Sequence, residues 1–226
     1  MTSPSAPTLG VIGLGSMGMG AALSALRNGG PTWGCDPRAE ARTAFEQASG
    51  HAVASAAGLA PHCDVVLVLV VNAAQTEDVL FGAQGIAPLL KKGAVVVTSA
   101  TVDPALPPQW EARLAEHGVF LIDGPVSGGA KKAAAGQMTV MASGKPEAFA
   151  AAGDLLNAFA GKVYRLGDAA GVGSTVKMVN QHLAGVHIAT ACEAMALGIK
   201  AGADPRQLYE VICNSAGMSW MFENRV

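Results

Sequence analysis

A cluster of glycines near the start of the chain has the spacing of a phosphate-binding loop. Gly13, Gly15 and Gly18 form the pattern G-x-G-x-x-G, directly after an apolar run and before a segment of helix-forming residues. The first glycine of this pattern permits a tight turn, the second lets the backbone approach a pyrophosphate, and the third lets helix and strand pack closely. The start of the helix adds free N–H groups and a partial positive charge. The pattern predicts a dinucleotide site, the alternative being a chance cluster in a chain with 28 glycines. The residues predicted to bind the cofactor in this glycine-rich loop are Gly13, Leu14, Gly15, Ser16, Met17 and Gly18.

An acidic residue follows the loop at the distance expected for a ribose contact. Asp36 closes the next apolar run, 18 residues after Gly18. A carboxylate at this position accepts hydrogen bonds from the ribose hydroxyls and repels a 2′-phosphate. The sequence therefore predicts NAD as the cofactor in preference to NADP, a preference that Arg38, two residues further on, weakens slightly.

Lys177 is the residue best suited to acid–base chemistry. It lies in a long apolar segment that we expect to form a buried helix, and buried lysines are rare without a partner or a function. Burial lowers the pKa of an amine, which can then accept the proton released when an alcohol is oxidised. Asn180 shares a helix face with Lys177, and Gly173 leaves space on that face. The alternative is a lysine that reaches solvent or forms a structural ion pair.

Three further loops lie where an open α/β sheet binds its ligands, beyond the carboxyl ends of the strands. The turn at Val70 and Val71 is one of them. Ser99 and Thr101 offer hydroxyls to a nicotinamide ring, or cap the following turn. The stretch 125–129, Pro-Val-Ser-Gly-Gly, offers free N–H groups and one hydroxyl that can hold a carboxylate, or is an ordinary glycine-rich loop.

The elements that position these residues alternate along the first three quarters of the chain. Continuous apolar runs indicate strands buried on both faces, and their alternation with helical segments indicates a parallel sheet. We expect an α/β fold with a Rossmann-type, doubly wound, mostly parallel sheet. The predicted strands are Leu9–Leu14, Thr32–Cys35, Asp64–Val71, Ala94–Ser99 and Val119–Ile122, with Met138–Ala142 and Lys162–Leu166 as possible additions. The predicted helices include Gly18–Arg27, Arg38–Gln47 and Trp110–Glu116.

A long helix follows, and with it a change of domain. Residues 171–201 contain no proline and are apolar on most sides, which predicts a helix buried between two domains. Gly202 is suited to end this helix, and Asp204 with Pro205 to begin another. We expect a Rossmann domain over 1–166, then over 167–226 the linking helix and the start of an incomplete all-helical domain. The chain would then be a fragment, or would be completed by a partner chain.

Composition excludes several classes of partner. The formal net charge is −2 with no basic run, which argues against nucleic acid. The apolar runs look too short or too interrupted for the roughly 20 residues that span a bilayer, so we expect no membrane segment. The four cysteines are scattered without a CxxC spacing. We therefore expect no zinc site and no disulfide, and a cytoplasmic protein with reduced thiols.

Four motifs, taken in order, resemble the β-hydroxyacid dehydrogenase family, which includes 3-hydroxyisobutyrate dehydrogenase and tartronate semialdehyde reductase. They are the glycine-rich loop, the turn ending in Thr101, the stretch 123–129 (Asp-Gly-Pro-Val-Ser-Gly-Gly), and Gly171-Val172-Gly173 followed by Lys177 and Asn180. The resemblance implies an NAD-binding Rossmann domain, a long linking helix, an all-helical domain and a homo-oligomer, a dimer or tetramer. It also implies that Lys177 is the catalytic acid/base and that Thr101, Val70 and Val71 touch the cofactor. The residues that it implies for substrate binding are Ser127, Gly128, Gly129 and Asn180.

Departures from the family pattern indicate a branch. The family commonly has Leu-Pro at Val70-Val71, a second Asn at Gln181 and Gly at Lys132. The version at residues 128–133, and the stretch 219–225, are similar to the branch that oxidises four-carbon sugar acids such as L-threonate next to the carboxylate, giving a 2-oxo acid. The alternatives are activity on 3-hydroxyisobutyrate or tartronate semialdehyde, and a non-catalytic dinucleotide-binding protein without the helical domain. Imine reductases resemble the family but usually lack the lysine, so Lys177 argues against them.

Overall fold

The computed structural model describes residues 6–226 and divides the chain into two compact units. The first unit ends at Lys177 and the second is Met178–Val226. The first unit contains the whole sheet and the glycine-rich loop, and the helix that bears Lys177 begins in it. The first unit is built on a β-sheet, whereas the second consists only of helices.

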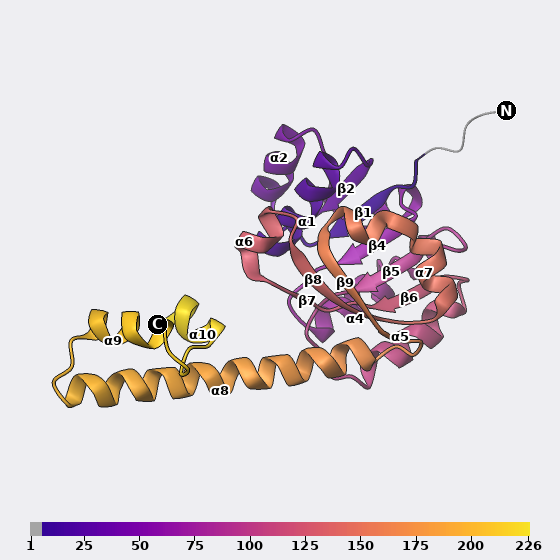
Figure 1. Cartoon of the computed structure of the whole chain (residues 1–226). Coiled ribbons are helices and arrows are strands. Elements are labelled where there is room, and N and C mark those ends of the chain that lie inside the picture. The colour runs from indigo at the N-terminus through magenta and orange to yellow at the C-terminus, as the bar shows by residue number, and fades with distance from the viewer. Residues whose placement is uncertain (1–5) are drawn as a thin grey trace. The chain divides into compact units, whose positions relative to one another are not determined.

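The first unit is a nine-stranded, mostly parallel sheet (Figure 1). The strand order is β3-β2-β1-β4-β5-β6-β8-β7, with β9 paired to β8. The pairs from β3 to β6 are parallel, β8 is antiparallel to both β6 and β7, and β9 is parallel to β8. The order 3-2-1-4-5-6 is that of a dinucleotide-binding Rossmann sheet, so the expected fold class is confirmed. The strands are β1 (Leu9–Ile12), β2 (Thr32–Cys35), β3 (His51–Val53), β4 (Val65–Val68), β5 (Val95–Thr98), β6 (Phe120–Asp123), β7 (Val126–Ser127), β8 (Met138–Ser143) and β9 (Ala160–Gly167).

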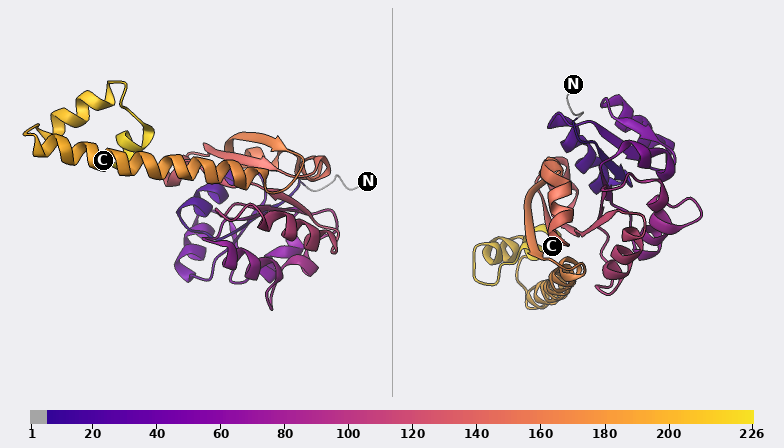
Figure 2. Two further views of the ribbon diagram at one scale, coloured as in Figure 1. Left: turned by 90° about the horizontal axis from the view of Figure 1, so that it is seen from below. Right: turned by 90° about the vertical axis from the view of Figure 1, so that its right-hand side faces the viewer.

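Helices cover both faces of this sheet (Figure 2). Residues of β1, β4 and β5 alternate between two apolar clusters, one on each face, as strands buried on both sides require. Phe45 is fully buried in one cluster and Trp110 in the other. The helices are α1 (Ser16–Arg27), α2 (Ala39–Gln47), α3 (Ala56–Leu59), α4 (Ala73–Phe81), α5 (Leu106–Ala115), α6 (Gly129–Ala134), α7 (Pro146–Ala152) and α8 (Val172–Lys200), with 3-10 turns at Ala60–His62, Ala87–Leu89 and Gly153–Ala158.

Strand ends differ from the predicted ones for a physical reason. The run predicted over Leu9–Leu14 ends as a strand at Ile12, because Gly13 has φ +95° and turns the chain away from the sheet. The run predicted over Asp64–Val71 is a strand only over Val65–Val68. The sequence reasoning missed β3 and β7, which have three and two residues and are too short to show an apolar pattern.

The second unit consists of the rest of α8 together with α9 (Pro205–Cys213) and α10 (Trp220–Arg225). Gly202 has φ +92°, as the predicted end of the long helix requires. The Asp204 carboxylate accepts hydrogen bonds from the N–H groups of Arg206 and Gln207, both at 3.0 Å. The predicted start of the next helix at Asp204-Pro205 is therefore confirmed. Within this unit the ring of Tyr209 stacks on that of Phe222.

The expectation that α8 is buried is wrong for this chain. Val179 and Leu183 are 52% and 51% exposed, and Val186 is 48% exposed. The two other helices of the unit have nine and six residues, too few to cover a helix of 29. Within residues 6–226, α8 is also the one helix that is long and apolar enough to span a membrane, judged by length and composition alone. The expectation that every apolar segment is too short or too interrupted to do so is therefore wrong for α8.

Candidate functional site

The glycine-rich loop has the geometry that its three glycines require. Gly13 has φ +95°, and a Cβ there would lie 2.5 Å from the carbonyl oxygen of Leu69. A Cβ on Gly18 would collide with the carbonyl oxygen of Gly13, so only glycine lets α1 lie this close to the loop. A Cβ on Gly15 would meet nothing within 4 Å. Gly15 therefore faces open space, where the backbone can approach a bound phosphate.

The start of α1 adds hydrogen-bond donors to the same place. Gly15 is the N-cap, with no side chain to occupy the free N–H groups of the first turn. Ser16 is exposed and Met17 half-buried, whereas the Leu14 side chain is buried in the core. The Leu14 N–H donates to Asp36 at 2.8 Å and the Leu14 carbonyl oxygen accepts from Arg38 at 3.2 Å, so Leu14 supports the shape of the loop. The loop fits a dinucleotide pyrophosphate, because it presents N–H groups and space without an opposing side chain.

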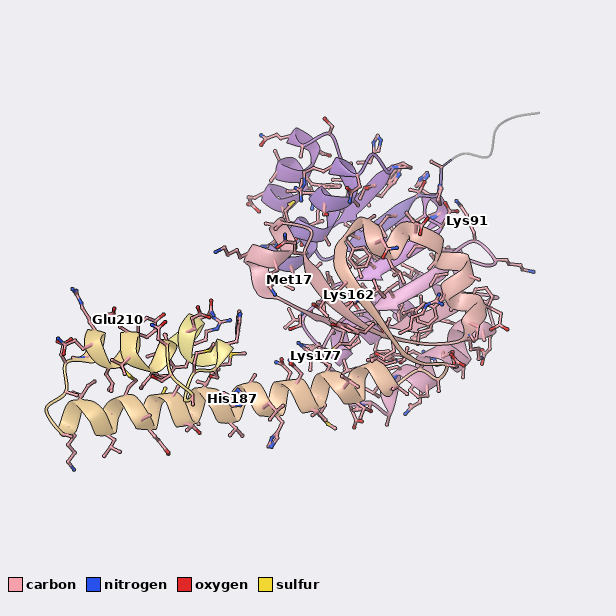
Figure 3. All side chains as sticks on the ribbon, viewed as in Figure 1. Met17, Lys91, Lys162, Lys177, His187 and Glu210 are labelled. Carbon is pink, nitrogen blue, oxygen red and sulfur yellow. The ribbon has the colours of Figure 1, made fainter. Side chains whose placement is uncertain are left out.

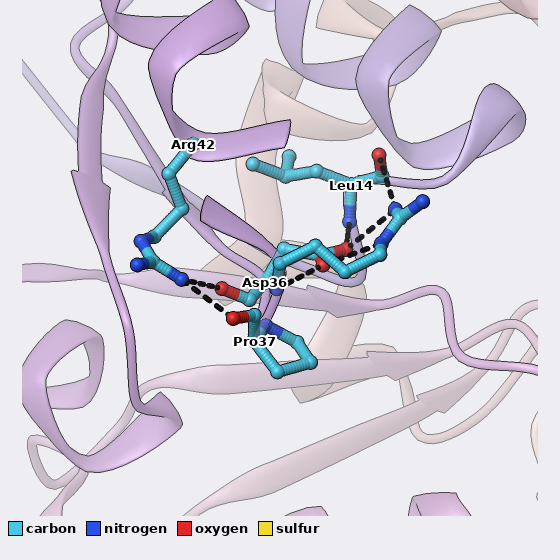
Figure 4. Close-up of polar contacts among 5 residues, drawn as sticks. Leu14, Asp36, Pro37 and Arg42 are labelled. Carbon is cyan, nitrogen blue, oxygen red and sulfur yellow. Dashed lines mark hydrogen bonds and ion pairs between the residues drawn. The ribbon is translucent and has the colours of Figure 1, made fainter. Parts of the chain in front are cut away.

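Asp36 lies at the carboxyl end of β2 and is held by two neighbours (Figure 4). Its carboxylate accepts hydrogen bonds from the Leu14 N–H at 2.8 Å and from the Arg38 Nε at 2.9 Å. Burial raises the pKa of Asp36, but the bonds from Arg38 and Leu14 outweigh burial and leave the pKa below its usual value. The Arg42 guanidinium donates to the carbonyl oxygens of Asp36 and Pro37, both at 2.8 Å. The carboxylate is therefore fixed and ionised at the edge of the site.

A cleft of about 870 Å³ joins several of the predicted cofactor residues. Gln75, which the sequence reasoning missed, also lines it and accepts a hydrogen bond from the Val71 N–H at 2.9 Å. Val71 is 80% exposed at the mouth of the cleft. The cleft has the size and the wall expected for the adenosine half of a dinucleotide. The predicted residues that line it are Gly13, Gly15, Asp36, Val70 and Val71.

The predicted carboxylate-binding turn connects β7 to α6. Gly128 and Gly129 have φ +131° and +70°, and a Cβ on Gly129 would meet nothing within 4 Å. Ser127 is half-buried, and its hydroxyl makes no side-chain hydrogen bond within the described part of the chain. The Lys132 side chain lies over Gly128, where a Cβ would come within 2.8 Å of the Lys132 Cβ. The turn is therefore open at Gly129 and lies against the aliphatic part of the Lys132 side chain at Gly128.

This turn and the glycine-rich loop are connected through the helices that follow them, because α6 packs on α1 (Figure 1). A Cβ on Gly20 of α1 would lie 2.6 Å from the carbonyl carbon of Ala133 in α6. The Arg27 guanidinium, also on α1, donates to the carbonyl oxygen of Ala134 at 2.7 Å. Helix α1, which follows the glycine-rich loop, thus packs against helix α6, which follows the predicted carboxylate-binding turn.

The two hydroxyls predicted after β5 differ in their environment. Ser99 is buried and its hydroxyl donates to the carbonyl oxygen of Gly124 at 2.8 Å. Thr101 is exposed. The Ser99 hydroxyl is therefore already used within the protein, and Thr101 is the residue of the two that a ligand can reach.

Lys177 is buried, with 7% of its surface exposed, on α8 (Figure 3). Burial lowers the pKa of its ammonium group below the usual value for lysine. No carboxylate among residues 6–226 forms an ion pair with it. Asn180 lies three residues further along α8, in the second unit, and is half-buried. A buried amine without a counter-ion is suited to accept and return a proton.

The space expected beside Gly173 is occupied. A Cβ on Gly173 would collide with the carbonyl oxygen of Met141 and lie 2.7 Å from that of Asp123. The glycine therefore lets α8 start against the backbone of β6 and β8, and it leaves no room for a ligand. This contact corrects the sequence-based interpretation of Gly173.

Sequence reasoning missed a buried polar cluster at the start of α8. The Asp123 carboxylate accepts hydrogen bonds from the N–H groups of Gly171 and Ser174 and from the Ser174 hydroxyl. Ser143 Oγ accepts one from the N–H of Gly173 at 2.9 Å. The sequence feature that could have indicated this cluster is Asp123 itself, an acidic residue at the carboxyl end of an apolar strand, where ligands bind and helices begin in an open α/β sheet.

Comparison with known proteins places these features in a family. Residues 8–167 match the NAD binding domain of 6-phosphogluconate dehydrogenase. Residues 171–226 match a domain described as NAD-binding of NADP-dependent 3-hydroxyisobutyrate dehydrogenase. Together the two matches include the glycine-rich loop, the carboxylate turn and Lys177.

Individual relatives agree with these matches. L-threonate dehydrogenase of Cupriavidus necator is 58% identical over 96% of this chain and 73% of its own length. L-threonate dehydrogenase of Escherichia coli K12 is 51% identical over 96% of this chain and 72% of its own length. A crystal structure described as 3-hydroxyisobutyrate dehydrogenase from Salmonella typhimurium has a TM-score of 0.92 at 49% identity, covering 97% of this chain and 76% of the other. The chain belongs to the 3-hydroxyisobutyrate dehydrogenase-like family of NAD(P)-binding hydroxyacid dehydrogenases.

Proposed function

We propose that the protein oxidises L-threonate at the carbon next to its carboxylate, giving the 2-oxo acid, with NAD as the cofactor and Lys177 as the acid/base. The observation that carries the chemistry is the buried amine of Lys177, which forms no ion pair with any carboxylate among residues 6–226. The choice of acid is supported by the identity of 58% with an L-threonate dehydrogenase.

Lys177 performs the proton transfer in this proposal. Its neutral Nζ accepts the proton of the substrate hydroxyl, the C2–H electron pair leaves with the hydrogen as hydride, and the C2–O bond becomes a carbonyl. When bound, the nicotinamide ring supplies the acceptor for that hydride. In the reverse direction the Lys177 ammonium returns the proton to the carbonyl oxygen. The lowered pKa of Lys177 serves the oxidation, because it increases the fraction of neutral amine near neutral pH.

The carboxylate turn and Asn180 orient the acid. The N–H groups of Gly128 and Gly129 and the Ser127 hydroxyl would hold the substrate carboxylate, since the turn is open at Gly129. The Asn180 amide, which shares α8 with Lys177, would contact a substrate hydroxyl. Thr101 would touch the cofactor, as its hydroxyl is exposed after β5.

Asp36 is the basis for choosing NAD. Its ionised carboxylate at the end of β2 can accept hydrogen bonds from both ribose hydroxyls and repels a 2′-phosphate. Arg38 works in the opposite direction, because its side chain is 59% exposed and could turn toward a phosphate. In this structure, however, the Arg38 guanidinium donates to the Asp36 carboxylate at 2.9 Å, so it is already occupied by that ion pair.

A second candidate substrate is 3-hydroxyisobutyrate. The structure described as 3-hydroxyisobutyrate dehydrogenase at 49% identity favours it. The two acids differ in the position of the oxidised carbon relative to the carboxylate, so the carboxylate turn would have to hold them differently relative to Lys177. Reduction of tartronate semialdehyde belongs to the same group of alternatives.

We further propose a homo-oligomer, a dimer or tetramer, in the cytoplasm. The exposed apolar side chains of α8 support self-association. The free thiols of the buried Cys35 and Cys63 are compatible with a reducing compartment. We place the domain boundary after residue 166, where β9 is about to end and α8 has not begun.

The decisive experiment measures NADH formation with L-threonate, 3-hydroxyisobutyrate and D-glycerate, each with NAD and with NADP. Turnover of threonate with NAD alone supports the proposal in full. Turnover of another acid overturns the choice of substrate and retains the reaction. NAD binding without any turnover, measured by calorimetry, overturns the catalytic role and leaves a non-catalytic dinucleotide-binding protein.

A further inference from the structure

We propose that Asp123 is a positioning residue for the reaction, because its buried carboxylate fixes the first turn of α8 to the end of β6 and so fixes Lys177. The inference rests on the proposed function of Lys177 and extends it to the element that holds the amine. It also gives a second role to the stretch 123–129, whose glycines we propose to bind the substrate carboxylate.

The contacts of Asp123 are directed at α8. Oδ2 accepts hydrogen bonds from the N–H of Gly171 at 3.0 Å and from the N–H of Ser174 at 2.8 Å. Oδ1 accepts the Ser174 hydroxyl at 2.6 Å. These N–H groups belong to the start of the helix, where they have no partner within it. A carboxylate there is also attracted by the helix dipole.

Ser143 completes the attachment from the neighbouring strand. Its hydroxyl lies 3.4 Å from Asp123 Oδ2 and accepts the N–H of Gly173 at 2.9 Å. Gly173 in turn has the backbone of Met141 and Asp123 against it, with no space for a side chain. The first turn of α8 is thus held by side chains and by direct contact with the backbone of two strands.

Lys177 follows this anchor by one helical turn. Asp123 is only 1% exposed, so substrate cannot reach its carboxylate. Burial lowers the Lys177 pKa, and the contacts of the Asp123 carboxylate are with the start of α8 rather than with the Lys177 amine. Asp123 therefore acts on Lys177 through geometry and not through its charge.

The test compares two substitutions at this position. Asp123→Ala removes every acceptor and should lower kcat for the hydroxy acid by about 10²-fold, the cost of a displacement of about 1 Å at a catalytic group. Asp123→Asn keeps an oxygen for the two N–H groups and an amide for the Ser174 hydroxyl, and should stay within about tenfold of wild type. An Asn variant as inactive as the Ala variant would overturn a geometric role.

A double-mutant cycle separates positioning from general stability. If Asp123 acts through Lys177, Asp123→Ala should change the residual kcat of Lys177→Ala by less than about threefold, because the group it positions is already absent. An equal loss in both backgrounds would mean that the two residues act independently, and would overturn the proposal. The gentler variant Ser174→Ala, which loses only the 2.6 Å bond, should show the same pattern at smaller size.

Asp64, whose side chain is 40% exposed, provides a control for the loss of a carboxylate that caps a backbone N–H elsewhere in the sheet unit. Its carboxylate also accepts a backbone N–H, that of Thr8 at 2.8 Å, and pairs with Lys91 at 2.8 Å, but it precedes β4 and so lies at the amino end of the strands, whereas Asp123 lies at the carboxyl end of β6. Asp64→Ala should lower the melting temperature and leave kcat within about threefold of wild type. A kcat loss equal to that of Asp123→Ala would show that any lost carboxylate has this effect, and would overturn the proposal.

A labelling experiment tests the anchor without any turnover. Reductive methylation followed by peptide mass spectrometry gives the labelling rate of Lys177 relative to the exposed Lys162. Asp123→Ala should accelerate labelling of Lys177, whereas Asp64→Ala should not. Unchanged Lys177 labelling in folded Asp123→Ala would overturn the anchor even if no hydroxy acid is turned over.

Discussion

At the scale of the residue, the proposal depends most on the Lys177 amine. Lys177→Ala should lower kcat by about 10²–10⁴-fold, the usual contribution of a general base, and leave the Kd for NAD nearly unchanged. In the oxidation direction, wild-type kcat/KM should rise with pH, because the neutral amine is the active form. Since burial lowers the Lys177 pKa, this rise should be centred below the usual pKa of lysine.

Stopped-flow turnover across pH and calorimetric NAD titration measure these effects, with the exposed Lys162→Ala as a control that should behave as wild type. A loss of NAD affinity as large as the loss of kcat would assign Lys177 to cofactor binding.

Asp36 makes a separate residue-scale prediction about cofactor preference. Asp36→Ala should weaken NAD binding and reduce the difference in affinity between NAD and NADP. The substitution removes both the hydrogen-bond acceptor for the ribose hydroxyls and the charge that repels a 2′-phosphate. It also frees Arg38, which now donates to the carboxylate at 2.9 Å. Adding Arg38→Ala should remove most of the NADP gain. Fluorescence titration with each cofactor measures the two Kd values, and an unchanged ratio would exclude Asp36 from the ribose site.

At the scale of the element, the packing of α1 on α6 depends on Gly20. A Cβ there would lie 2.6 Å from backbone atoms of Ala133, so Gly20→Ala must push the two helices apart. We expect a loss of stability of about 1–3 kcal/mol, the usual cost of overpacking, together with weaker binding of both cofactor and acid. Gly29→Ala is the control for the loss of a glycine, since a Cβ on Gly29 would meet no atom within 4 Å, although its φ of +80° adds strain. Urea unfolding and the two KM values measure the difference.

How much of the structure the sequence predicts differs between elements. The buried strands, α1 and α8 follow from apolar runs and glycine spacing, and the residues of the glycine-rich loop take the conformations that their positions imply. The anchor at Asp123 does not follow, because its partners are 20 to 51 residues away in the chain. The exposure of α8 could not be predicted from the sequence either. An apolar sequence indicates that a helix can be buried, but it does not indicate which other element packs against it.

At the scale of the whole molecule, the two units differ in how much apolar surface they bury. Both large apolar clusters lie in the first unit, while most apolar side chains of α8 beyond Lys177 are exposed. Backbone amides of residues 178–226 should therefore exchange with deuterium faster than those of the sheet, because little tertiary packing opposes local opening. Exchange measured over a range of protein concentrations tests this expectation. Protection of α8 that rises with concentration would indicate that a second copy covers it, and slow exchange in dilute monomer would contradict the prediction.

The contact between α1 and α6 also has a thermodynamic consequence. A ligand that fixes the glycine-rich loop also fixes α1, and thereby restrains α6 and the turn before it. Cofactor and acid should then bind with positive cooperativity, and linkage requires each to raise the affinity for the other by the same factor. In steady-state kinetics this coupling would appear as an apparent KM for each ligand that falls as the concentration of the other approaches saturation.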